Sequence, residues 1–381
     1  MLKDLIYYLR LGNESLDKVA HKAEIDIEDI KAIIQGNREP TLKELRKLSK
    51  VLRIPLSKLL AENKEEQENY VLYRNKPNNL KEYAAREKIS YIIQTINDNL
   101  NNSLEDSNLS LISYNQELFS NPILLANFVR EIFLGNLSSE PTYRIEPILF
   151  LPNILSKILN CYIFCIDIGA DGASALVDNR GYIFVSPKFL PRMLFTIAHE
   201  FGHLLAHHGK KESFLAIDLN IENSKFRSKN DFNNQEVFAN TFAINLLLPE
   251  AGVVYFIRNI RQLYKSSAPG ITDFEIIQLS HHFGVSFIVA ALRLEDLGLL
   301  QKGDAFSIYQ EILSNNGSPE KRAREYNIPE RNITHISTYP EEITKATIQA
   351  IRDEKISIGK ASEFLNISID KIYQLNQMDE L

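Results

Sequence analysis

The sequence predicts a multidomain, mainly α-helical protein with one small β-sheet in its middle part. Apolar residues recur with the helical period along most of the 381 residues, whereas short-strand patterns occur only near residues 160–186. A polar and charged run, AENKEEQEN at 61–69, separates a short N-terminal region from the rest. We therefore expect an all-α N-terminal domain, an α+β central domain and a helical C-terminal region.

Changes in composition divide the chain into four expected regions. These are residues 1–60, a domain of short helices; 61–108, a linker and connecting helix; 109–300, the domain with the sheet; and 301–381, a helical C-terminal region. The connecting helix is expected at 81–100. The Asn-rich stretch 97–108 is expected to be a flexible joint.

Composition and charge exclude several classes of protein. The formal net charge of −6 gives no overall positive field, so contact with nucleic acid would need a local basic patch. Cys161 and Cys165 would lie about 13 Å apart along a strand, too far for a disulfide. Lys3 and Asp4 interrupt the place where a signal peptide is apolar, and no run approaches the about 18 apolar residues of a membrane span. We expect a cytoplasmic protein without membrane contact.

Residues 1–60 are expected to form short helices with tight turns. An opening helix ends near Leu11, and further helices are expected at 16–23, 27–35 and 41–52, with Ser15 and Thr41 as N-caps and Gly36 as a helix stop. The segments LDKVAHKAEI and QGNREPTLKELRKLSKVLRIPLSKLL resemble the XRE-type helix-turn-helix domain of phage repressors. This resemblance implies DNA binding.

Charge gives mixed support for DNA binding by this region. It holds twelve Lys and Arg against nine Asp and Glu, an excess of three positive charges over residues 1–60. Lys31 and Arg38 are the expected phosphate contacts. However, Glu28 and Asp29 stand where the presumed recognition helix begins, and carboxylates there would repel phosphates. The alternative is a protein-interaction or dimerisation module of the same fold.

Strand patterns appear only in the central region. NCYIFCIDI predicts one buried strand, and ASALVDNRGYIFVS predicts two strands joined through residues 178–181. Before them, a helix framed by Asn121, Pro122 and Gly135 and a second helix at 152–160 are expected. An edge strand of this sheet could bind an extended peptide substrate, although an ordinary structural hairpin explains the pattern equally well.

Residues 199–203 read HEFGH and predict a metal-dependent hydrolase. His199 and His203 lie one helical turn apart, so both imidazoles can face one metal ion. Glu200 can take a proton from an attacking water and pass it to the leaving amine. The alternative is a buried helix whose histidines are hydrogen-bonded within the core.

A catalytic zinc usually takes three protein ligands, so a third was sought. His207 would lie about 12 Å from His199 along the helix, beyond the reach of one ion. Glu236 opens the helical segment EVFANTFAINLLLP and shares a face with Asn240, which could steady a ligand by a hydrogen bond. Alternatively, Glu236 is a first-turn glutamate that favours the helix dipole.

Three segments carry a second resemblance. RMLFTIAHEFGHLLAHH, EVFANTFAINLLLP and HHFGVSFIVAALRLEDLGLL are similar to the ImmA/IrrE family of metallopeptidases over roughly residues 120–300. The resemblance implies a zincin-like α+β domain in which His199, His203 and Glu236 bind the metal and Glu200 is the general base. Zinc is the implied metal, and the family also tolerates manganese. Its members act in the bacterial cytoplasm and cut helix-turn-helix repressors.

The C-terminal segment 341–375 predicts three helices and a small helix-turn-helix-like unit. Its mixed charge selects neither DNA nor protein, so it is expected to be a recognition or dimerisation tail or to have a plain packing role. The sequence leaves open whether the chain forms a homodimer.

Taken together, these patterns predict a regulatory metal-dependent endopeptidase that cleaves a repressor or antitoxin partner and is targeted by its own helix-turn-helix domain. The alternative is a DNA-binding regulator whose peptidase-like domain senses metal or a ligand without cutting.

Overall fold

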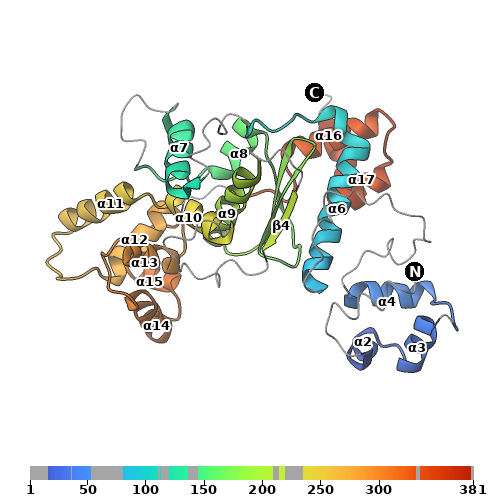
Figure 1. Cartoon of the computed structure of the whole chain (residues 1–381), viewed down its shortest axis with the longest axis horizontal. Coiled ribbons are helices and arrows are strands. Elements are labelled where there is room, and N and C mark those ends of the chain that lie inside the picture. The colour runs from blue at the N-terminus through green and yellow to red at the C-terminus, as the bar shows by residue number, and fades with distance from the viewer. Residues whose placement is uncertain are drawn as a thin grey trace.

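The protein is mostly helical around one four-stranded mixed sheet (Figure 1). The structure is a computed structural model that describes residues 16–35, 37–52, 80–109, 112, 120–135, 145–208, 214–218, 235–331 and 335–378. The expected mainly α fold with a small sheet is therefore confirmed at this level. The division into four domains remains a prediction.

The sheet consists of β1 (Tyr162–Cys165), β2 (Gly172–Val177), β3 (Arg180–Val185) and β4 (Phe214–Asp218), in the order β1-β3-β2-β4. β1 runs parallel to β3, and the other pairs are antiparallel. Asp178 and Asn179 turn β2 into β3 with positive φ angles of 50° and 63°, as a two-residue hairpin requires. The three predicted strands are confirmed. β4 was not predicted, because five isolated residues give no readable period.

Helices cover one face of the sheet and form the larger core. α9 (Leu190–His208) packs on β2 and β3, and α10 (Gln235–Leu247) packs between α9 and α7 (Pro122–Gly135). α8 (Leu151–Leu159) packs beside α9 and β1. Asn121 caps α7 as predicted, since its Oδ1 accepts from the backbone N–H of the residues two and three positions later. This layer carries the HEFGH motif.

The opposite face of the sheet is covered by helices that precede and follow the sheet in the sequence. α6 (Leu80–Leu100), α16 (Glu341–Arg352) and α17 (Ile358–Leu365) share one hydrophobic cluster with that face (Figure 1). Successive residues of a strand point to opposite faces of the sheet and so belong to different hydrophobic clusters. Tyr162, Phe164, Tyr182 and Phe184 point to α6, whereas Ile163, Cys165, Ile183 and Val185 belong to the core around α9. The sheet is therefore buried on both sides.

Residues 101–108, expected to belong to a flexible joint, form hydrogen bonds to the β2–β3 hairpin. A short 3₁₀ helix, η1 (Asn101–Ser103), follows α6 directly, and Arg180 of β3 donates hydrogen bonds to Asn101. The backbone N–H of Gly181 donates to Ser107 Oγ at 2.8 Å, and the N–H of Ser107 donates to the Asn179 carbonyl at 3.0 Å. Asn101 and Ser107, residue types that are common in linkers, here contact the β2–β3 hairpin. Composition alone could not show this partner.

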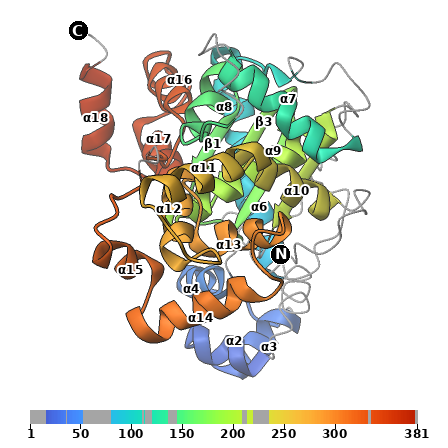
Figure 2. The same ribbon diagram turned by 90° about the vertical axis from the view of Figure 1, so that its left-hand side faces the viewer.

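In the described part of the chain, five helices lie between α10 and the C-terminal helices. They are α11 (Glu250–Leu263), α12 (Asp273–Phe283), α13 (Phe287–Asp296), α14 (Asp304–Asn316) and α15 (Pro319–Glu325), seen together in Figure 2. The last helices, α16, α17 and α18 (Ile369–Met378), confirm the three predicted C-terminal helices. In the described ranges no single helix is long and apolar enough to cross a membrane, although two bent pairs, α10–α11 and α12–α13, together pass by length and composition.

At the N-terminal end, α2 (Leu16–Ala23), α3 (Ile27–Gln35) and α4 (Leu42–Leu52) pack around Val19, Ile30 and Leu48. The predicted N-cap at Thr41 is confirmed. The Glu44 backbone N–H donates to Thr41 Oγ1, while the Glu44 carboxylate accepts from the Thr41 N–H at 2.8 Å. The expected opening helix, Ser15 and Gly36 lie outside the described residues.

The same three-residue turn joins α2 to α3, α12 to α13 and α17 to α18. Its first residue is left-handed in each, with φ of 50° at Glu24, 70° at Gly284 and 51° at Asn366. The bend between α12 and α13 is 107°, within the range of helix-turn-helix pairs. The second helices differ, because α13 is largely buried whereas α18 exposes most of its residues.

Candidate metal centre

The two histidines of the HEFGH motif meet on the buried side of α9. His199 and His203 are 0% and 1% exposed, and their Nε2 atoms lie 3.1 Å apart. This approach follows from their spacing, since residues four apart on a helix stand above one another. Both imidazoles therefore face one point, as the motif predicted.

The first turn of α10 brings Glu236 to the same point. Its Oε2 lies 3.6 Å from His199 Nε2, and its Oε1 lies 3.4 Å from His203 Nε2. The three side chains each offer one ligand atom, and these atoms all lie within 4.8 Å of one another. Two imidazoles and one carboxylate form a donor set suited to catalytic zinc, with a position left for water or substrate. His199, His203 and Glu236 could thus hold a metal ion, and the half-exposed Glu236 faces solvent.

Gly202 lets α9 and α10 approach closely enough for Glu236 to lie beside the two histidines. A Cβ atom at Gly202 would lie 3.0 Å from Phe242 Cδ1 and 3.2 Å from Ala239 Cα, tighter than ordinary contact. Ala239 and Ala243 are fully buried on the facing side of α10. Ala239 and Ala243 on α10, together with Gly202 on α9, thus allow a close contact between the two helices.

Asn240 lies one turn beyond Glu236 and contacts the His199 ring at Nδ1. Its Oδ1 is 3.0 Å from His199 Nδ1, and the side chain is buried. When Oδ1 accepts a hydrogen bond from Nδ1–H, the lone pair of His199 is on Nε2, the atom nearest Glu236. The geometry suits the orienting hydrogen bond expected for Asn240.

Glu200 is fully buried and is held against β2. Ser174 Oγ donates a hydrogen bond to Glu200 Oε2 at 2.7 Å. Two residues earlier on the same strand face, a Cβ atom at Gly172 would lie 2.5 Å from Glu200 Oε1, so only glycine leaves room there. Gly172 and Ser174 thus fix the carboxylate from the sheet side. Sequence reasoning missed both, because a glycine and a serine in a strand carry no specific signal.

A buried carboxylate anchors the start of α9. Arg192 donates to Asp171 Oδ2 at 2.7 Å, and Lys188 donates to the other carboxylate oxygen. Burial raises the pKa of Asp171, but the hydrogen bonds from the two cations outweigh it, so the pKa lies below its ordinary value. This ion cluster ties α9 to the loop before β2. Of its members only Arg192 belonged to a quoted motif.

Two buried arginines donate hydrogen bonds to carbonyl groups at the C-terminal end of α10. The last carbonyls of a helix lack partners within it, and here they are buried and followed by Pro249. Arg130 donates to the carbonyls of Leu246 and Glu146, and Arg293 Nε donates to that of Leu248 at 3.0 Å. Burial lowers the pKa of Arg130 to about 10. These contacts join segments far apart in sequence, so no local pattern could have indicated them.

The predicted DNA contacts have partners within the chain. Lys31 Nζ lies 2.7 Å from Glu28 Oε1, and an Arg38 guanidinium nitrogen lies 2.7 Å from Glu44 Oε1. Arg38 also lies 3.7 Å from Asp29. Their contact with phosphate remains a prediction. The structure does not describe the side chain of His207.

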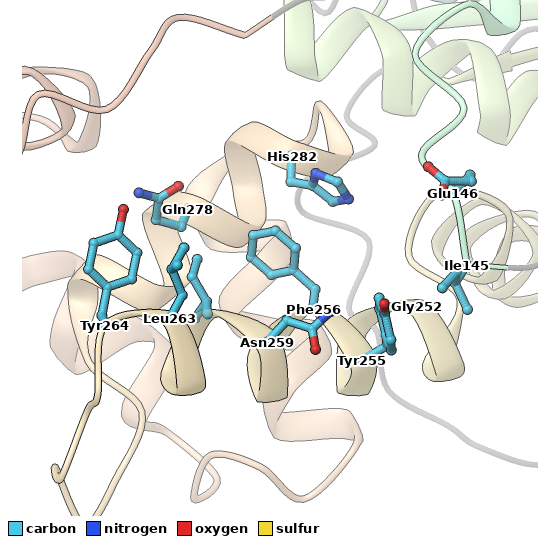
Figure 3. A pocket seen from close by; sticks show the side chains of 11 residues that line it. Ile145, Glu146, Gly252, Tyr255, Phe256, Asn259, Leu263, Tyr264, Gln278 and His282 are labelled. Atoms are coloured by element: carbon cyan, nitrogen blue, oxygen red, sulfur yellow. The ribbon is translucent and has the colours of Figure 1, made fainter. Parts of the chain in front are cut away.

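A separate pocket of about 370 Å³ lies between α11, α12 and residues 145–146 (Figure 3). Phe256 stacks on His282 there, with ring centroids 4.5 Å apart. Burial lowers the pKa of His282. None of the pocket's lining residues belongs to the metal cluster, so it has no part in the site described above.

Comparison with known families agrees with this geometry. Residues 158–295 match the family model described as the IrrE N-terminal-like domain, a metallopeptidase family. The match begins just before β1 and ends in α13, so it contains the sheet, the HEFGH helix and Glu236. No curated protein matches the chain. The family match supports the peptidase part of the resemblance over residues 158–295.

Proposed function

We propose that this chain is a metal-dependent endopeptidase. The observation that carries the proposal is the convergence of His199, His203 and Glu236 beside the buried Glu200, inside the segment that matches a peptidase family. A zinc ion, or manganese in its place, held by these three ligands would supply Lewis-acid chemistry at a peptide carbonyl.

The residues of the chain then perform the proton transfers. Glu200 accepts a proton from the water that attacks the carbonyl carbon and delivers it to the amine as the C–N bond breaks. Ser174 holds one oxygen of Glu200, and Asn240 holds His199 in the tautomer that offers Nε2. Burial of the cluster limits the water that competes with these contacts.

The sheet offers a place for an extended substrate. β4 is an edge of the four described strands, and its neighbour β2 carries Ser174. Ala216 of β4 stands opposite Ser174 in the register. A peptide added by backbone hydrogen bonds to the side of β4 that no other described strand occupies would run alongside the strand pair that holds Glu200. This arrangement favours an extended segment of a protein as substrate.

The substrate we propose is a repressor or antitoxin protein, in the cytoplasm. The support is the fusion of the peptidase-like segment to an N-terminal unit whose sequence resembles XRE-type domains. A module that binds the same DNA as a repressor, or pairs with the same kind of domain, raises the local concentration of the peptidase at its target. Cleavage would then control transcription.

The test is fragment formation by the purified full chain. The chain and its Glu200→Gln variant are loaded with zinc and incubated with repressor-like proteins encoded beside it, and products are read by mass spectrometry. We expect fragments from the wild type alone, with equal metal content in both. Asn259→Ala, at an exposed position of α11, serves as an active control. A Glu200→Gln variant that binds metal and keeps the full biological output would contradict the proposal.

A second candidate function is metal sensing without cleavage. The observation in its favour is that His199, Glu200 and His203 are all at most 1% exposed. Metal binding would then change the stability of the α9–α10 contact and the affinity for a partner. Metal-dependent partner binding that is unchanged in Glu200→Gln, with no fragments from the wild type, would favour this reading.

A further inference from the structure

The charges of the N-terminal helices are separated into two surfaces. On α4, Lys43, Arg46 and Lys50 are exposed and, with Leu42 and Lys47, line an open groove along the helix. Positions 43, 46 and 50 share one helix face and span about 10 Å along its axis. We name Lys43, Arg46 and Lys50 the α4 basic face.

The beginning of α3 carries the opposite charge. Glu28 and Asp29 occupy its first turn, and their side chains are 75% and 47% exposed. Asp26 caps the helix by accepting from the Glu28 N–H at 2.8 Å. Three carboxylates at this end oppose the approach of a phosphate backbone.

The cations expected to offset them are already engaged. Lys31 is bonded to Glu28, and Arg38 is bonded to Glu44. Arg38 also supports the capping box of α4, because the same Glu44 accepts from Thr41. A phosphate would have to displace these carboxylates before it could bind either cation. The side of α3 is therefore a poor anion site.

The α4 basic face is less engaged, because the nearby Glu24 interacts mainly with Lys47 and less with Lys43, and both cations lower its pKa. Lys43, Arg46 and Lys50 form no ion pair with any residue in the described part of the chain. Lys47, on the flank, is instead bonded to Glu24 at 3.0 Å. Three cations that form no ion pair with the described residues and share one helix face fit a partner with regularly repeated negative charge.

We propose that the α4 basic face binds the phosphate backbone of duplex DNA without reading its sequence. The inference rests on the DNA-targeting part of the proposed function and changes the site that would carry it, from α3 to α4. Each cation that contacts a phosphate releases condensed counterions from the DNA. Three such contacts give a slope of about −2.7 in a plot of log affinity against log salt concentration.

The experiment measures binding of the full chain to a fluorescent mixed-sequence duplex by anisotropy at several salt concentrations. We expect Lys43→Gln/Arg46→Gln/Lys50→Gln to lower affinity roughly 10- to 100-fold near 100 mM salt and to reduce the salt slope by about 2.7. Lys355→Gln/Lys360→Gln/Lys371→Gln removes the same charge elsewhere and should bind like the wild type. Lys31→Gln/Arg38→Gln should change affinity less than threefold.

A charge-conserving variant guards against a folding defect. Lys43→Arg/Arg46→Lys/Lys50→Arg should keep the wild-type salt slope. Equal binding by the α4 variant and the wild type would overturn this site but leave DNA targeting standing. No binding by the wild type at about 50 mM salt would overturn both, while fragment formation would still test the peptidase separately. Loss of salt-sensitive self-association with unchanged DNA binding would identify a protein interface instead and overturn the proposal.

Discussion

Ser174 of β2 donates a hydrogen bond to Glu200 of α9 across 2.7 Å. Both side chains are fully buried, so the contact is not exchanged for water in the folded state. The bond fixes the carboxylate proposed as general base from the sheet side, next to the space that only Gly172 leaves free. The sheet is thus part of the site as well as its support.

Removing this hydroxyl should impair catalysis more than metal binding. We expect Ser174→Ala to lower kcat for fragment formation roughly 10- to 100-fold through misplacement of Glu200, with KM nearly unchanged. Ser174→Thr, which keeps the hydroxyl, should recover much of the rate. Metal content, measured by mass spectrometry, should match the wild type. A normal kcat in Ser174→Ala would show that Glu200 needs no such support.

Loss of the amide behind His199 should weaken metal binding. Asn240→Ala removes the acceptor of the Nδ1 hydrogen bond, and such outer contacts typically contribute 10- to 100-fold in metal affinity. Competition with a chromophoric chelator measures the change. Asn259→Ala, at an exposed position of α11, is the matched control. If the two variants bind zinc equally well, Asn240 does not orient the ligand.

The contact between α9 and α10 should not tolerate a methyl group at Gly202. The new Cβ would meet Ala239 Cα at 3.2 Å, so Gly202→Ala must push the helices apart. We expect a loss of about 1–3 kcal/mol in the free energy of unfolding and weaker zinc binding, since Glu236 moves with α10. Gly270→Ala, which meets nothing within 4 Å, is the control. Urea unfolding that is equal for both variants would contradict this account.

Arg293 should matter for stability although it is remote from the metal cluster. It donates to the Leu248 carbonyl and to Asn245 Oδ1, and its loss leaves buried acceptors without a donor. We expect Arg293→Leu to cost about 1–3 kcal/mol for each group left unsatisfied. The exposed Arg258 on α11, changed to Leu, controls for loss of charge. Urea midpoints measure the difference, and a stable Arg293→Leu variant would refute the role.

The Arg38–Glu44 pair should make the N-terminal unit sensitive to acid. The hydrogen bond from Arg38 and those from Thr41 lower the pKa of Glu44 from 4.5 to about 2. Because the folded pKa is below the unfolded one, its stabilising effect is fully present above pH 4.5 and lost as the pH falls towards 2. The stability difference between the wild type and Glu44→Gln, followed by hydrogen exchange in α4, should shrink over that range. A difference independent of pH would contradict it.

Sequence patterns alone predicted many of the helices, three of the strands and the pairing of the two histidines. His199 and His203 meet because helical spacing alone places them on one face, and the strands of the hairpin were readable because Asp178, Asn179 and the alternating apolar residues act locally. Glu236 was one of two open interpretations on its own pattern, and the family resemblance implied that it is the third ligand. Local sequence patterns therefore predict which residues meet within one helix or one hairpin.

Contacts between different elements became visible only in the folded chain. Gly202 against Ala239, Ser174 against Glu200 and Arg293 against the end of α10 join residues from different elements, and their side chains give no periodic signal. The second layer over the sheet, from α6 and α16, joins segments more than 200 residues apart. The α4 basic face likewise emerged only when Lys31 and Arg38 were found paired, because which cations stay free depends on which carboxylates the fold brings near them.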